Sequence, residues 1–293
     1  MILSQTIKCA SRLGEKKAVE LITKAGFDAI DYSMAELKSD NSVLNSDNYK
    51  SYISDLCETA KKHNVIFNQG HALTYIYNEN PETAHRLLTE RNIKALEIAG
   101  LMGIKTLIIH PVDVGNYIGN EESVFEKNMK YYRTLLPYAE EYGVKIACEN
   151  TWCVDKKRGV TRGSVCSNPY EHAKYVDEIK NDMFVACLDV GHCSLSGREA
   201  ADCIRVLGKR LGALHIHDND YKDDMHTLPG LSEMNWDEIT KALAQIEYPG
   251  DFTLESHHFF DSLNTEEEVF TGLKLAALIG RKMIKKIEDS INL

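Results

Sequence analysis

The chain has 293 residues, of which 43% are hydrophobic and 27% are charged, with only 6 prolines. This composition is ordinary for a soluble α/β enzyme, and no low-complexity tract or linker interrupts it. The formal net charge of −10 argues against a nucleic-acid partner, because proteins that bind nucleic acid neutralise its phosphates with lysine and arginine.

No apolar run approaches the roughly 20 residues that a membrane-spanning helix needs. The first residues, MILSQTIKCASRLGEKK, lack the basic and apolar regions of an export signal. We therefore expect a cytoplasmic protein without a membrane partner. The eight cysteines are scattered and form no CxxC pair, so free thiols are expected in a reducing compartment.

Strand-like and helix-like segments alternate along the whole chain, giving eight units of one strand and one helix. The predicted strands cover residues 2–8, 27–33, 65–73, 104–111, 144–150, 184–192, 210–218 and 251–257. The predicted helices cover residues 14–26, 46–64, 81–103, 121–143, 168–180, 197–208, 235–246 and 265–289. Proline at a helix start (Pro81) and glycine at a helix end (Gly26) support two of these boundaries.

Repeated β-α-β order predicts a parallel sheet, and eight units favour closure of that sheet into a barrel. The predicted fold is α/β, a (β/α)8 TIM barrel of one domain over residues 1–293, since such a barrel needs about 250 residues. An open dinucleotide-binding sheet is disfavoured, because no GxGxxG follows the first strand. Two long loops, at 151–167 and 218–234, are expected to shape the site.

Six predicted strands end in a side chain that can bind a metal. These residues are His71, His110, Glu149, Asp189, His215 and Glu255, at intervals of 39, 39, 40, 26 and 40 residues. The C-terminal ends of barrel strands meet at one face, where the active sites of these barrels lie. Any one of these residues, taken alone, is typical of a solvated residue at the barrel rim or of a helix cap. Six in register predict a site.

Alternation along each strand decides which of these side chains point to the barrel axis. Glu149, Asp189, His215 and Glu255 come from adjacent strands and are predicted to converge on one divalent metal. A donor set of mostly oxygens with one imidazole suits Mn²⁺, Co²⁺ or Mg²⁺, with Zn²⁺ also compatible. We expect Glu149 and Glu255 to be the catalytic acid/base pair as well, and no organic cofactor is expected.

A further group of residues is expected to bind a second metal or the substrate: His71, His110, His192, Asp224 and His226. For His217, His257 and His258 we expect no role, because their closeness to the motifs in the sequence is the sole reason to consider them as site residues.

The segments that carry these residues resemble a known family. Glu149-Asn150-Thr151, Asp189-Val190-Gly191-His192, His215-Ile216-His217-Asp218-Asn219 and Glu255-Ser256, with DDMHTLPG and NWDEI, are similar to motifs of sugar phosphate isomerase/epimerase proteins in the xylose-isomerase-like TIM-barrel superfamily. The resemblance spans nearly the whole chain. In the ketose 3-epimerase branch, residues matching Glu149, Asp189, His215 and Glu255 bind one metal, and the two glutamates act on opposite faces of the sugar.

The resemblance implies proton abstraction next to a carbonyl, through an enediolate, on a ketose or related sugar. Return of the proton to the opposite face gives epimerisation, transfer between carbons gives isomerisation, and loss of a β-hydroxyl gives dehydration of an inosose or keto-glycoside. Two departures indicate a different substrate recognition from the 3-epimerases: no arginine follows His215 in DNDYKDDMH, and Asp155 stands where that branch has glutamate. Relatives are often dimers or tetramers, so a homodimer or homotetramer is compatible with the resemblance.

A second resemblance implies another class of enzyme. Endonuclease IV, a DNA-repair phosphodiesterase on the same barrel, holds three zinc ions. Its nine ligands match His71, His110, Glu149, Asp189, His192, His215, Asp224, His226 and Glu255. The net charge of −10, the segment LHIHDND and the NTW after Glu149 argue against that activity. We therefore expect a small-molecule sugar substrate and keep the phosphodiesterase as the alternative.

Overall fold

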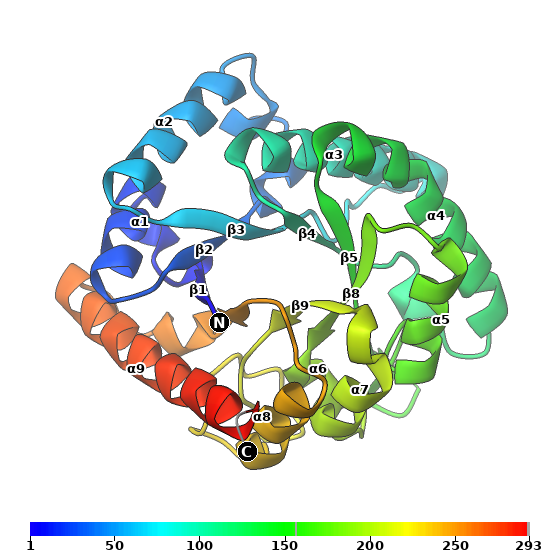
Figure 1. The fold of residues 1–293 in the computed structure, drawn as a ribbon. Coiled ribbons are helices and arrows are strands. Elements are labelled where there is room, and N and C mark those ends of the chain that lie inside the picture. Colours follow the sequence, from blue (N-terminus) through cyan, green and yellow to red (C-terminus); the bar gives the residue numbers. More distant parts are fainter. Residues whose placement is uncertain (156, 292–293) are drawn as a thin grey trace.

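The fold is a barrel of eight parallel strands surrounded by helices. The computed structural model describes residues 1–155 and 157–291. The strands pair in the order β10-β1-β2-β3-β4-β5-β8-β9, and helices cover the outer face of the sheet (Figure 1). Their bounds are β1 (Leu3–Thr6), β2 (Ala29–Ser33), β3 (Ile66–His71), β4 (Thr106–Ile109), β5 (Lys145–Glu149), β8 (Phe184–Asp189), β9 (Leu211–His215) and β10 (Phe252–Leu254).

The barrel closes where β9 meets β10. Ile216 and Leu254 form a parallel bridge just beyond the end of β9. The Ile216 N–H donates to the Thr253 carbonyl at 2.9 Å, and the Glu255 N–H donates to the Ile216 carbonyl at 2.9 Å. The predicted TIM barrel is therefore confirmed.

A helix follows each strand as the sequence predicts, with one correction. The strand predicted over 184–192 ends at Asp189, and a short unpredicted helix begins at Val190 because the Asp189 side chain caps it. The bounds of the helices are α1 (Glu15–Lys24), α2 (Tyr49–Lys62), α3 (Pro81–Met102), α4 (Glu121–Tyr142), α5 (Pro169–Ile179), α6 (Val190–Leu195), α7 (Ala200–Leu207), α8 (Trp236–Gln245) and α9 (Glu266–Ile291). Helix α3 begins with Pro81 after Asn80, whose side chain accepts from the Thr83 N–H at 2.9 Å. It ends at Gly103, which takes a left-handed conformation (φ 75°) that glycine adopts without strain.

The barrel interior is apolar on one side and polar on the other. Small or branched side chains from β4, β5, β8 and β9 pack together there: Ile108, Ala147, Cys187 and Ala213. Across the barrel, buried polar side chains come from the adjacent strands β10, β1 and β2: Thr253, Thr6 and Asp31. Strand alternation therefore directs these side chains to the axis as predicted, and the mouth of the barrel lies above them.

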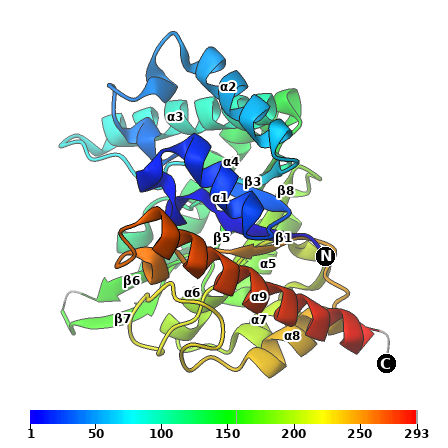
Figure 2. The ribbon, with the colours of Figure 1, turned by 90° about the vertical axis from the view of Figure 1, so that its left-hand side faces the viewer.

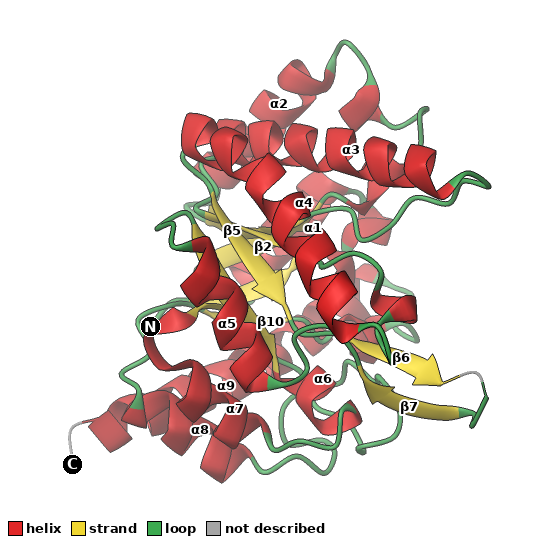
Figure 3. Cartoon of the chain, turned by 90° about the vertical axis from the view of Figure 1, so that its right-hand side faces the viewer, coloured by secondary structure: helices red, strands yellow, loops and turns green. Residues whose placement is uncertain are grey.

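The loop expected at 151–167 contains a two-stranded antiparallel hairpin. Strands β6 (Trp152–Asp155) and β7 (Val160–Gly163) project from the body of the barrel in both side views (Figures 2 and 3). Asp155 accepts from Arg158 at 2.9 Å and from Arg162 at 3.1 Å, so it fastens the hairpin. The turn residues and alternating pattern are weak here, and the sequence alone predicts only an irregular loop.

Two smaller observations concern the cysteines and the length of the apolar helices. All eight cysteines are free thiols, as predicted. None of the helices in the described part of the chain is long and apolar enough to cross a membrane.

Candidate active site

Two glutamates and one histidine meet at the mouth of the barrel. Nδ1 of His215 lies 2.9 Å from Oε1 of Glu149 and 3.2 Å from Oε2 of Glu255. The three side chains come from the ends of β9, β5 and β10, and each is at most 4% exposed. Three of the four predicted metal ligands therefore converge on one point.

The charges of this trio are strongly coupled. Burial disfavours the charged form of His215, but Glu255 and Glu149 outweigh it and raise the pKa of His215 to about 10. Burial likewise opposes ionisation of Glu149, yet His215 and His110 hold its pKa well below the usual range. The raised pKa favours a protonated imidazole between the two carboxylates, and a divalent cation bound there would take over this role of positive partner.

The spacing of these donors fits a metal ion. Ligands bound at about 2.1 Å to an octahedral ion lie about 3 Å apart. The 2.9 Å and 3.2 Å separations around His215 match that spacing. The donor set of two carboxylates and one imidazole suits Mn²⁺, Co²⁺, Mg²⁺ or Zn²⁺.

His71 and His110 lie on the other side of Glu149. Nε2 of His110 is 2.8 Å from Oε2 of Glu149 and 3.1 Å from Nε2 of His71. The His71 ring also stacks on the His215 ring, with centroids 5.4 Å apart. Glu149 therefore has one oxygen facing His215 and the other facing this histidine pair, an arrangement that would let it bridge two cations.

Asp189 lies at the junction with a second cluster. The Asp189 side chain caps helix α6 by accepting from the His192 N–H at 2.8 Å, the capping role that a sequence of this kind often has. Its carboxylate also contacts Nε2 of His217 at 2.9 and 3.1 Å. The expectation that His217 has no role is therefore at odds with its contacts, since this buried imidazole pairs with a predicted ligand.

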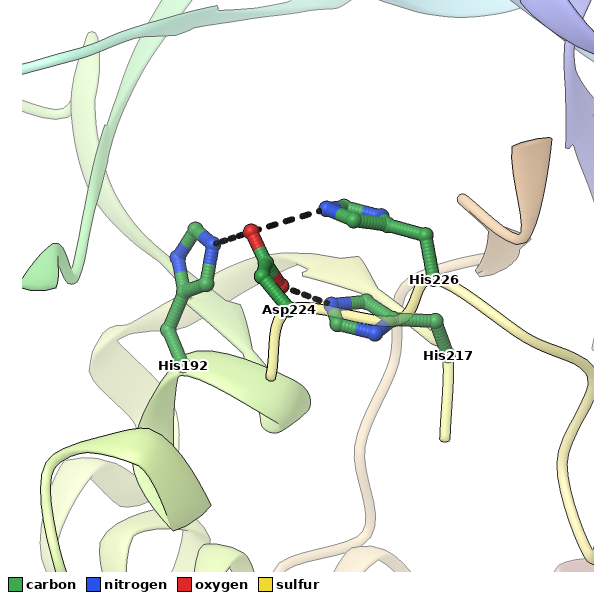
Figure 4. A group of neighbouring side chains, drawn as sticks. All are labelled: His192, His217, Asp224 and His226. Atoms are coloured by element: carbon green, nitrogen blue, oxygen red, sulfur yellow. Dashed lines mark ion pairs between the residues drawn. The ribbon is translucent and has the colours of Figure 1, made fainter. Parts of the chain in front are cut away.

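Four side chains gather in this second cluster, which consists of His192, His217, Asp224 and His226 (Figure 4). Asp224 lies between the imidazoles, with Oδ2 3.2 Å from Nε2 of His226 and 3.5 Å from Nε2 of His192. The rings of His217 and His226 stack with centroids 3.9 Å apart. Their potential ligand atoms all lie within 4.8 Å of one another, which is compatible with one bound cation.

Backbone carbonyls orient three of the site histidines in the same way. Nδ1 of His71, His192 and His226 lies 2.9, 2.9 and 2.7 Å from the carbonyl oxygens of Ala72, Asn150 and Glu255 respectively. A carbonyl oxygen only accepts, so each Nδ1 carries the proton. Nε2 is then directed at Glu149 in His71 and at Asp224 in His192 and His226. This is the outer support that metal-binding histidines usually have.

Lys8 also reaches the site, although no sequence motif pointed to it. It follows β1, and Nζ is 3.2 Å from Oε1 of Glu255. Residues Ile7–Cys9 form a 3-10 turn, so strand alternation does not place Lys8, and no pattern in the sequence could have found it. His257 and His258, for which no role was expected, lie beside His226 with ring centroids 4.5 and 5.4 Å away.

One family of known proteins matches most of the chain. Residues 19–275 match the model of the family described as xylose isomerase-like TIM barrel. This chain belongs to that family. The match covers the six strand-end residues and the second cluster, but not Lys8.

Two relatives with named activities are sugar epimerases. D-psicose 3-epimerase of Enterocloster bolteae is 26% identical over 251 residues, covering 82% of this chain and 76% of that protein. The D-psicose 3-epimerase of Ruminiclostridium cellulolyticum is 22% identical over the same length, covering 82% of this chain and 77% of that protein. An uncharacterised protein of Methanocaldococcus jannaschii is 25% identical over 64% of this chain, but the match spans only 62% of its own length.

Several solved structures share the barrel. A D-tagatose 3-epimerase-like protein superposes with a TM-score of 0.72 at 20% identity, covering 100% of this chain and 98% of that one. IolI protein, solved with a zinc atom, gives 0.70 at 19% identity and full coverage of both chains. At these identities the likeness supports the fold of the xylose isomerase-like barrel and no finer property.

Proposed function

We propose that this chain is a divalent-metal-dependent sugar isomerase or epimerase that removes a proton next to a carbonyl. The observation that carries the proposal is the convergence of Glu149 and Glu255 on the same nitrogen of His215. Two carboxylates on either side of one cation site are the groups that proton removal and return require. The relatives named D-psicose 3-epimerase support the same substrate class.

Each residue has a proposed part in the reaction. Glu149, His215 and Glu255 would hold the ion (Mn²⁺, Co²⁺, Mg²⁺ or Zn²⁺), with Asp189 as the fourth ligand once its carboxylate turns from His217 to the ion. When bound, it would act as a Lewis acid on the sugar oxygens and stabilise enediolate charge. Glu149 and Glu255 take and return the proton on opposite faces of the substrate. Lys8 fixes the carboxylate of Glu255 through its 3.2 Å contact and adds positive charge at the mouth.

Solvent exchange tests the proposal across many sugars at once. In ²H₂O with added Mn²⁺, one or more members of a panel of ketoses are expected to take up deuterium next to the carbonyl, as followed by NMR. Glu149→Gln and Glu255→Gln are expected to reduce the rate at least 100-fold. Exchange that survives in both variants would contradict the acid/base assignment. Loss of a hydroxyl from the product would instead indicate the dehydratase reaction on an inosose or keto-glycoside.

The second candidate is a phosphodiesterase of the endonuclease IV type. The observation that favours it is the presence of two further groups of donors, His71–His110 beside Glu149 and the His192–Asp224–His226 set. Metal analysis separates the two functions. One manganese, cobalt or magnesium per chain supports sugar chemistry, whereas three tightly held zinc ions with cleavage of abasic DNA would support the phosphodiesterase.

A further inference from the structure

A cleft of about 610 Å³ opens from the candidate active site toward the outside of the barrel. Its inner end is formed by His110, His192 and Trp152. Its sides come from the loop after β3, the loop after β4 and the first turns of α3 and α4. Glu149, His215 and Glu255 do not line it, so most of this volume lies beyond the reacting centre.

The size of the cleft exceeds what a single sugar needs. Its volume corresponds to about twenty water molecules at the density of the liquid. A ketohexose, with about twelve non-hydrogen atoms, places its reacting carbons at the glutamates and so occupies only the inner end. Space for a second ring remains between the loop after β3 and the loop after β4.

The lining matches an uncharged, ring-shaped group. Ile76, Leu88 and Val112 give apolar walls, and Tyr75, which is 72% exposed, offers a free aromatic face at the rim. Apolar walls with a few polar groups are usual for sites that bind small molecules. A sugar ring suits them, because its C–H faces are apolar and its hydroxyls lie at the edge.

The charge at the outer end is balanced. Lys127 lines the cleft and forms an ion pair with Asp113, which also lines it. This outer end therefore carries no net positive charge that would favour a phosphate over a neutral group. Hydroxyl groups, by contrast, can donate to Asp113 and accept from Lys127 at once.

From this geometry we infer that the substrate is a glycoside, a ketose or keto-sugar that carries a second, uncharged sugar ring in the cleft. The inference rests on the proposed function for the identity of the reacting sugar. Beyond that function, it specifies that the substrate has a second ring and that this ring is uncharged. The walls that select for the second ring are the loop after β3 and α3.

Calorimetric titration of the Mn²⁺-loaded protein with matched probes tests the inference. The probes are D-fructose, the glycosylfructoses lactulose and isomaltulose, and fructose 6-phosphate. At least one glycosylfructose is expected to bind at least tenfold more tightly than fructose. Equal or weaker binding of both, tighter binding of the phosphate, or no binding of any probe would overturn the inference.

Variants locate the preference in the cleft. Leu88→Trp and Ile76→Trp fill it from α3 and from the preceding loop, and both are expected to reduce glycosylfructose binding to the level of fructose. Leu101→Trp, at a 49% exposed position on the same helix and outside the cleft, is the control and is expected to bind like the wild type. If neither Leu88→Trp nor Ile76→Trp alters the preference, the second ring does not lie here.

Deuterium exchange in the same samples separates this inference from the proposed function. Tight binding of a glycosylfructose without exchange would leave the cleft assignment standing and contradict the epimerase. If fructose exchanges as fast as both glycosylfructoses and binds with equal affinity, the result would support the proposed epimerase function. It would contradict the inference that the substrate is a glycoside.

Discussion

Nε2 of His217 lies 2.9 Å from Oδ1 of Asp189, and both side chains are fully buried. The imidazole packs directly over Gly191, where an added Cβ would come within 2.0 Å of Cε1 of His217. The glycine of the DVGH segment is therefore required by close approach of a ring. This contact ties helix α6 to the strand end that carries His215.

The Gly191 contact gives a first prediction. Gly191→Ala is expected to push His217 away from Asp189 and to destabilise the protein by about 1–3 kcal/mol, as overpacking usually does. It should also weaken metal binding at the second cluster. Chemical unfolding and metal analysis after dialysis measure the two effects. Gly115→Ala, where a Cβ meets nothing within 4 Å, is the matched control, and an equal effect there would contradict the explanation.

Lys8 gives a prediction about catalysis. Lys8→Met removes the partner of Glu255 Oε1 and is expected to lower kcat/KM for sugar exchange about 10- to 100-fold, mainly through kcat. Lys8→Arg, which keeps the charge, is expected to recover part of the rate. Steady-state exchange kinetics of both variants provide the measurement. A Lys8→Met enzyme with unchanged kcat would show that the lysine is only a surface partner of the glutamate.

Removal of metal is expected to destabilise the fold as well as abolish exchange. Burying Glu149, Glu255 and Asp189 together is costly unless cations compensate them. A ligand present at 100 times its Kd stabilises the folded state by about 2.7 kcal/mol. Chelator-treated protein should therefore melt several degrees lower, with recovery on addition of Mn²⁺. Identical Tm values with and without metal would contradict binding at this site.

The ion pair of Asp28 and Arg281 joins the start of β2 to α9 and gives a pH prediction. Burial raises the pKa of Asp28, but bonds from Arg281 and the Leu3 N–H outweigh it and lower this pKa below its usual range. The folded state therefore gains stability above pH about 4, and the gain is lost as pH falls through the lowered pKa.

Asp28→Asn is the corresponding test. Because the Asp28 side chain is 41% exposed, solvent screening limits the expected loss at pH 7 to about 1 kcal/mol. Urea unfolding at pH 7 and pH 3 should show the difference from wild type narrowing at the lower pH. Arg281→Gln should produce the same pattern, and the double variant should add little. If the difference in unfolding free energy between wild type and variant widens at pH 3, the pKa of Asp28 is not lowered by folding.

Strand alternation predicted much of the site. Glu149, His215 and Glu255 lie where a period of two along each strand places them, because barrel strands impose that period rigidly. The rule does not reach Lys8, because the chain leaves the strand after Thr6 and Ile7–Cys9 form a 3-10 turn. A lysine after a first strand gives no signal of its own. The partners of Asp224 depend on how the long loop after β9 packs. Local sequence does not encode that packing, so the contacts of Asp224 with His192 and His226 were not predictable.

The bridge between β9 and β10 has a consequence for folding. His215 precedes Ile216 and Glu255 follows Leu254, so the two donors become neighbours only when this last pair of strands meets. A chain with an open barrel holds the two residues on opposite edges of an unfinished sheet. The complete donor set then belongs to the closed state, so an ion that binds all of it would favour completion of the barrel by mass action. In such a protein, the rate of ion uptake during refolding would report the rate at which β9 and β10 pair.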